Sequence, residues 1–165
     1  MRPQQYKNSF RSEAQLVRRF VGLLNQRGSP WAGAQAVREW DYRTGITDIL
    51  VRNRRDELIA FEAKLTDWRR ACYQAYRTTS FVLRAYVVLP EEVALRAQTY
   101  SEFFTRFGVG LCACGSRKIS VLLEAKPKEP IMEWLAEKAH ATFDGIINAG
   151  TTRSRGHCRT RLQTA

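Results

Sequence analysis

Residues 45–65, GITDILVRNRRDELIAFEAKL, contain two short apolar runs separated by a charged turn. Apolar runs of this length predict two buried strands joined as a hairpin. Three ionisable residues, Asp48, Glu62 and Lys64, lie inside the runs. An unpaired charge in a protein core costs several kcal/mol or shifts its pKa until it is neutral. These three residues therefore indicate a site that needs charge.

The register of this hairpin decides whether the two carboxylates meet. Side chains alternate along a strand, so Glu62 and Lys64 point to the same face. A two-residue loop would place Asp48 opposite Phe61 and send Glu62 to the other face. The turn NRRDE lacks the Asn-Gly or Asp-Gly pair that two-residue loops prefer, which favours a loop of about three or five residues centred on Arg55. Asp48 is then directly opposite Glu62, with Cβ atoms about 4.5–5.5 Å apart.

Two carboxylates this close repel each other unless a cation lies between them. Carboxylate oxygens, completed by a backbone carbonyl such as that of Ala63 and by waters, are the usual protein ligands of Mg²⁺ or Mn²⁺. Such an ion can acidify a bound water and polarise a phosphoryl oxygen, and a lysine can orient the water or stabilise the developing negative charge. The set Asp48, Glu62 and Lys64 therefore favours phosphodiester hydrolysis.

The charge of the chain agrees with a polyanionic partner. Lysine and arginine outnumber the acids 27 to 16, which gives a formal net charge of +11. No apolar run reaches about 18 residues, and the first ten residues lack the apolar core of a signal peptide. We therefore expect a cytoplasmic protein that binds DNA, or alternatively RNA, and not a membrane.

The periodicity of the remaining chain predicts an α/β protein with the element order α β β β α β α β β α. The expected elements are a helix over 12–28, a strand over 34–42, the hairpin, a helix from Thr66 or Asp67, a strand over 83–90, a helix over 91–108, a closing hairpin over 109–126 and a helix opened by Pro130. We expect one domain over residues 1–150 and a basic, flexible tail over 151–165.

The cysteines offer a second metal-binding pattern. Cys112 and Cys114 form a C-x-C pair that could in principle bind zinc together with His157 and Cys158. This spacing differs from that of common zinc sites, so we expect the pair to be small residues that fill a strand.

Asp48, the strand ending in FEAKL, the helix carrying YQAY and the strand YVVLP together resemble the PD-(D/E)XK nuclease superfamily, the restriction endonuclease-like fold. The resemblance covers residues 10–90, and Thr47 stands where the name-giving proline would be. It implies a mixed central sheet flanked by helices and a metal-dependent DNA endonuclease. Asp48 and Glu62 would bind Mg²⁺ or Mn²⁺, and Lys64 would assist the attacking water.

The same resemblance implies two further site residues and an assembly. Members of the superfamily often add an acid from the first helix, here Glu13, and a glutamine from the helix after the lysine strand, here Gln74. Small nucleases of this fold commonly dimerise, which implies a possible homodimer.

Simpler interpretations remain open for the helical residues. Glu13 is also an acid near a helix N-terminus, where the dipole favours it. The face that carries Gln74 could look onto the metal cleft or be solvated. A set of cationic and aromatic residues on the same helix could contact phosphates and bases or could simply increase solubility: Arg69, Arg70, Arg77 and Tyr73. The alternative function is a nucleic-acid-binding or assembly subunit that keeps the fold but does not cut.

Overall fold

The computed structural model describes residues 10–153. Its helices and strands are α1 (Glu13–Leu24), β1 (Gln35–Asp41), β2 (Ile46–Arg52), β3 (Leu58–Ala63), α2 (Trp68–Thr78), β4 (Arg84–Pro90), α3 (Glu91–Gln98), α4 (Ser101–Phe107), β5 (Gly110–Cys114), β6 (Ile119–Leu123) and α5 (Glu133–Arg153). Among these residues, no helix is both long and apolar enough to span a bilayer.

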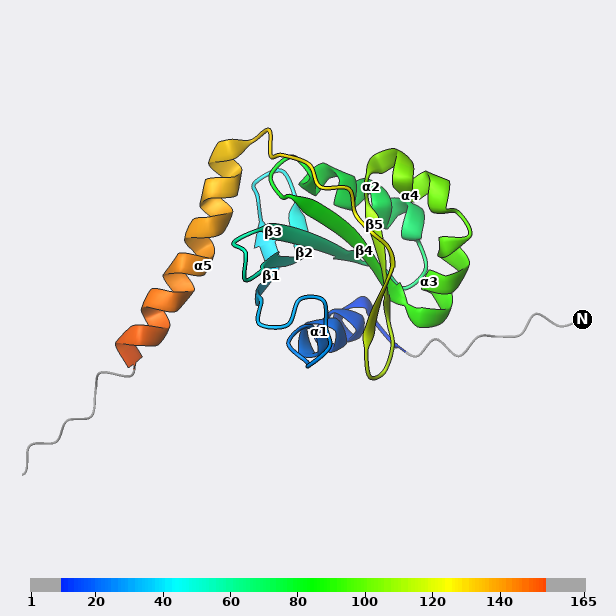
Figure 1. The fold of residues 1–165 in the computed structure, drawn as a ribbon, viewed down its shortest axis with the longest axis horizontal. Helices are drawn as coiled ribbons and strands as arrows, with labels where there is room; N and C mark the ends of the chain where they lie inside the picture. The colour runs from blue at the N-terminus through cyan, green and yellow to red at the C-terminus, as the bar shows by residue number, and fades with distance from the viewer. Residues whose placement is uncertain (1–9, 154–165) are drawn as a thin grey trace, which may run out of the picture.

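The six strands form one mixed sheet in which spatial order follows sequence order, β1 to β6. The β3–β4 and β4–β5 pairs are parallel, and the other neighbours are antiparallel. Helix α1 covers one face of the sheet, and α2, α3 and α4 cover the other (Figure 1). The predicted α/β class, with a mixed central sheet flanked by helices, is confirmed.

The sheet has a hydrophobic core on each face, and strand β3 lies between the two cores. Every one of its residues is buried. Leu58 and Ala60 pack with the α2 side, whereas Ile59, Phe61 and Ala63 pack with the α1 side. A strand covered on both faces is apolar along its whole length. Its one charged residue, Glu62, is therefore enclosed by protein and is 2% exposed.

The turn between β2 and β3 fixes the register that the sequence predicted. Asn53 N donates to Glu57 O at 3.0 Å, and the Asn53 Oδ1 atom accepts from the backbone N–H groups of Arg55 and Glu57. Asp56 closes the turn with a positive φ of 62°. The three residues between Asn53 and Glu57 make a three-residue loop of the type I plus left-handed kind. Ile49 consequently pairs with Phe61, as predicted.

The helix expected over 91–108 is two helices, so that prediction was wrong. The break falls at Thr99, whose hydroxyl donates to Arg96 O at 2.8 Å, a local bond that competes with the helical ladder. Helix α3 packs on β5, while α4 turns so that Phe103 and Phe104 contact Trp68 on α2. A single straight helix could not satisfy both contacts.

The last helix begins at Glu133, and the expectation that Pro130 opens it was wrong. The backbone N–H groups of Ile131 and Met132 both donate to Ser80 O, which holds this segment against the end of α2. Helix α5 continues through Arg153, past the predicted domain boundary at residue 150. Residues 154–165 of the predicted tail lie outside the described residues.

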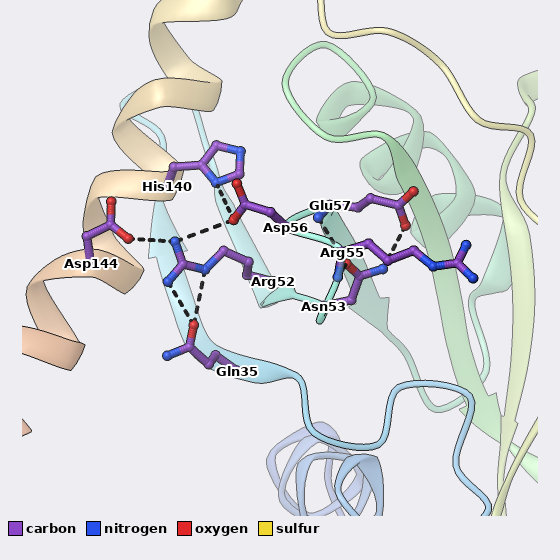
Figure 2. Close-up of polar contacts among 8 residues, drawn as sticks. All are labelled: Gln35, Arg52, Asn53, Arg55, Asp56, Glu57, His140 and Asp144. Atoms are coloured by element: carbon purple, nitrogen blue, oxygen red, sulfur yellow. Dashed lines mark hydrogen bonds and ion pairs between the residues drawn. The ribbon is translucent and has the colours of Figure 1, made fainter.

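Helix α5 is held to the sheet through Arg52 (Figure 2). The Arg52 guanidinium donates to Asp144 Oδ1 at 2.7 Å and, through Nε and Nη2, to Gln35 Oε1 at 3.1 and 2.9 Å. It also lies 5.2 Å from the centre of the Phe143 ring and 3.6 Å from Asp56 Oδ1. The Arg52 side chain is 10% exposed, so one largely buried cation joins β1, the turn and α5.

Replacing this cation is expected to loosen α5. We expect Arg52→Ala to lower the free energy of unfolding by about 1–3 kcal/mol, because Gln35 and Asp144 lose a charged partner and the Phe143 ring loses a contact. Urea denaturation followed by circular dichroism measures the change. The matched control is Arg55→Ala in the same turn, whose side chain is exposed. Equal stability of the two variants would contradict the proposed anchoring.

Candidate functional site

Asp48 and Glu62 face each other at the end of the β2–β3 ladder. Continuing the pairing of Ile49 with Phe61 by one residue places Asp48 opposite Glu62. At this point a side chain replaces the backbone as the hydrogen-bond acceptor, because Asp48 Oδ2 accepts from Ala63 N at 2.8 Å. Glu62 Oε1 is buried and accepts no hydrogen bond from any described residue. The pair thus holds one fixed carboxylate and one buried oxygen without a partner.

Burial is the main cause of the shifted pKa values of both carboxyls. Burial first, and the nearby Asp48 carboxylate second, raise the pKa of Glu62 to about 8. Burial also raises the pKa of Asp48, against the opposing effects of the Ala63 N–H and of Lys64. A carboxyl with a pKa of about 8 carries a proton at neutral pH. The nearby Lys64 ammonium therefore offsets only part of the effect of burial on Glu62.

Lys64 and Glu13 form an ion pair beside the carboxylates. Lys64 Nζ lies 2.9 Å from Glu13 Oε2, and the lysine side chain is 19% exposed. The ammonium lowers the pKa of both Asp48 and Glu62, which places it within electrostatic reach of the pair. The structure therefore brings together four of the predicted site residues: Asp48, Glu62, Lys64 and Glu13.

A cleft of about 610 Å³ opens to Asp48 from the α1 side. Its lining residues come from α1, β1 and β2: Glu13, Ala14, Val17, Arg18, Arg38, Glu39 and Asp48. Glu39 has a positive φ of 53° where the β1–β2 ladder passes Asp48, since its neighbours Arg38 and Trp40 pair with Ile49 and Thr47. Arg18, Arg38 and Glu39 were not predicted from the sequence. The sequence pattern of a strand does not indicate which residue other than glycine adopts a left-handed backbone conformation.

Helix α2 contributes the opposite side of the site. Gln74 Oε1 is buried without a hydrogen-bond partner among the described residues, so no hydrogen bond joins this oxygen to the carboxylates. Arg77 Nη2 donates to Thr44 O at 2.8 Å. Burial raises the pKa of Tyr42, Arg77 opposes this rise and Glu62 adds to it, so all three side chains share one neighbourhood. Tyr42 was not predicted, because its place next to Glu62 depends on the turn between β1 and β2.

The residues present fit a cation bound by carboxylates better than one bound by sulfur or imidazole. Among residues 10–153, no three His, Cys, Asp or Glu side chains converge closely enough to hold a metal ion. Cys112 and Cys114 are buried in β5, and burial raises the pKa of the Cys114 thiol to about 12. His157 and Cys158 lie outside the described residues. An ion bound by Asp48 and Glu62 would need backbone carbonyl and water ligands as well.

Comparison with known proteins establishes a fold relationship. No family model matches the sequence, and no curated protein matches it either. The structure superposes on protein SPO1766 of unknown function from Silicibacter pomeroyi with a TM-score of 0.60 and 14% identity, covering 91% of this chain and 98% of that chain. A repair endonuclease from Pyrococcus abyssi superposes with a TM-score of 0.32 and 21% identity over 56% of this chain and 39% of that chain. The first match shows a shared fold, and the second is too partial to carry an argument about activity.

Proposed function

We propose that the protein is a metal-dependent endonuclease of the restriction endonuclease-like class that hydrolyses DNA phosphodiester bonds. The observation that carries the proposal is the buried Glu62 carboxyl, with an unpartnered oxygen, opposite Asp48. Such a pair of ionised carboxylates destabilises a protein unless a proton or a metal cation neutralises it. Glu62 lies in a central strand where any apolar side chain would pack, so its carboxyl is best explained by function.

Each residue of the site has a role in this proposal. Asp48 and Glu62 would hold Mg²⁺ or Mn²⁺, with the Ala63 carbonyl as a further ligand, and the ion would supply an acidified water and charge neutralisation. Lys64 orients the attacking water and stabilises the negative charge that develops on the phosphate. Glu13 holds the Lys64 ammonium in place. Arg18 and Arg38 line the cleft that leads to Asp48 and would attract phosphates.

DNA is the proposed substrate because of the charge of the chain and of the cleft. The formal net charge of +11 and the two cleft arginines favour a polyanion. The alternative, a nucleic-acid-binding subunit that does not cut, shares this surface. A subunit that only binds nucleic acid does not need two facing carboxylates. A cleavage assay therefore distinguishes the two functions.

The role of Lys64 provides the first test. Wild-type protein is expected to cut DNA in Mg²⁺ or Mn²⁺ and not in EDTA, and Lys64→Met is expected to cut at least about 100-fold more slowly because the water and the phosphate lose their cation. Linear, supercoiled and branched DNA and single-stranded RNA form the substrate panel, analysed on denaturing gels. Lys126→Met, a change of an exposed lysine, is the matched control and should cut like wild type.

Two outcomes would count against this assignment. Cleavage that persists in EDTA would show that no divalent ion takes part. Tight DNA binding by the wild type without cleavage of any substrate in the panel would favour the non-cleaving subunit.

A further inference from the structure

Helices α2 and α4 expose a set of aromatic side chains that the catalytic proposal does not use. Tyr73 is 51% exposed and Tyr76 is 44% exposed. The Tyr73 ring lies 5.8 Å from Phe103 and 5.1 Å from Phe107, and the Tyr76 ring lies 5.4 Å from Phe107, all in edge-to-face contacts. Such contacts hold the two tyrosine rings in place while half of each side chain faces solvent. We call Tyr73, Tyr76, Phe103 and Phe107 the α2–α4 platform.

Cations surround the platform. Lys128 Nζ lies 5.6 Å from the centre of the Tyr76 ring, and three arginines of α2 and one of α4 are exposed: Arg69, Arg70, Arg77 and Arg106. The exposed acids on the same two helices and their caps are Asp67, which caps α2 by accepting from Arg70 N, and Glu102. Positive charge therefore exceeds negative charge around the exposed rings. This combination complements a ligand that carries both phosphates and flat apolar groups.

The platform shares helix α2 with Arg77, which lies in the neighbourhood of the candidate active site. Tyr73 precedes Gln74, whose buried Oε1 has no partner among the described residues. Arg77 follows Tyr76 and donates to Thr44 O, and both Arg77 and Glu62 act electrostatically on Tyr42. Residues three and four apart share a helix face, so Tyr73, Tyr76 and Arg77 form one exposed surface. A strand lying on it would lead from the rings toward the carboxylates.

We infer that the α2–α4 platform binds an unpaired segment of a DNA substrate and delivers it to the site. Bases would stack on Tyr73 and Tyr76, and the neighbouring arginines would contact phosphates. Only unpaired bases offer free faces for stacking, because the base faces of a duplex are covered by their neighbours. The inference rests on the proposed function, since the platform would supply the strand that is cut. It makes single-stranded, forked or gapped DNA the preferred substrate class.

The experiment measures binding without catalysis. Fluorescence anisotropy in EDTA compares a labelled thymidine oligomer with a duplex of equal length, for wild type, the double variant Tyr73→Ala/Tyr76→Ala and the double variant Tyr73→Phe/Tyr76→Phe. The alanine pair is expected to weaken single-strand binding at least about 10-fold and duplex binding less than about 2-fold. The phenylalanine pair should bind the single strand about as tightly as wild type, because its rings can still stack on bases. Trp134→Ala, a change of a side chain that is also 51% exposed but lies on α5, is the matched control.

Each result decides between the two proposals. Equal losses for single-stranded and duplex DNA, an equal loss in Trp134→Ala, or no single-strand binding by the wild type would overturn the platform. If the wild type cuts DNA but the alanine pair binds single-stranded DNA as tightly as wild type, the nuclease proposal is supported and the platform proposal is wrong. If the tyrosines are needed for binding but no substrate is cut, the single-strand site stands and delivery to a catalytic centre falls.

Discussion

Replacing either facing carboxylate by its amide, Asp48→Asn or Glu62→Gln, is expected to lower magnesium-dependent DNA cleavage about a thousandfold or more. Each change removes one of the two anionic ligands that would hold the ion, while leaving side-chain size nearly unchanged. The amide introduced by Asp48→Asn would still offer an oxygen to the Ala63 N–H that the Asp48 carboxylate now binds. Single-turnover cleavage of the preferred substrate, at saturating protein, measures the loss directly.

DNA binding provides the internal control for these variants. In EDTA both amides are expected to bind DNA at least as tightly as wild type, because phosphate contacts come from the basic surface and neither change adds negative charge. Glu92→Gln changes an exposed acid on α3 and should cut normally. If either site variant retains more than about a tenth of wild-type cleavage, the chemistry lies elsewhere in the chain.

Metal-free protein is expected to lose stability as the pH rises from about 5 to about 8. The pKa of Glu62 is about 8 in the folded protein against an ordinary value of 4.5, so the folded state holds a proton that the unfolded state has released. The stability that this proton contributes is complete below pH 4.5 and is lost as the pH approaches about 8. The slope reaches about 1.4 kcal/mol per pH unit at most. The raised pKa of Asp48 acts in the same direction.

The variant Glu62→Gln tests the origin of this slope. It is expected to flatten the dependence of unfolding free energy on pH and to be more stable than wild type at about pH 8 in EDTA, by on the order of a few kcal/mol. Added Mg²⁺ should raise the melting temperature of wild type at this pH and should have little effect on the variant. Chemical denaturation at about pH 5, 6.5 and 8 gives the comparison. An unchanged slope in Glu62→Gln would assign the proton to another group.

The sequence was sufficient to predict the part of the site that lies within one hairpin. Asp48 and Glu62 belong to consecutive strands, and the composition of the turn disfavoured the two-residue loop that would have separated them. Local rules of turn length and side-chain alternation were enough to place these two residues. The presence of Glu13 in the site could be expected only from the family resemblance, and its ion pair with Lys64 was not predicted, because α1 reaches Lys64 through tertiary packing.

The features that the sequence did not predict depend on contacts between distant segments. The break at Thr99 follows from the packing of α4 against Trp68. Helix α5 starts later than predicted because the backbone N–H groups of residues 131 and 132 donate to Ser80 O. Helical periodicity continues through the first break, and the proline rule placed the second boundary too early. The place of Tyr42 beside Glu62 depends in the same way on a turn whose conformation the pattern does not reveal.

The three-residue turn between β2 and β3 has a consequence for how this chain can diverge. Strand β3 presents apolar residues to both cores, so hydrophobic packing alone would also allow a register in which its two faces are exchanged. Only the length of the turn then prevents Glu62 from turning toward α1 and away from Asp48. Related chains that keep the carboxylate pair should therefore vary in the residues at positions 54–56 and accept no insertion or deletion of an odd number of residues there. A one-residue length change in this turn would mark a lineage that has kept the fold and lost the site.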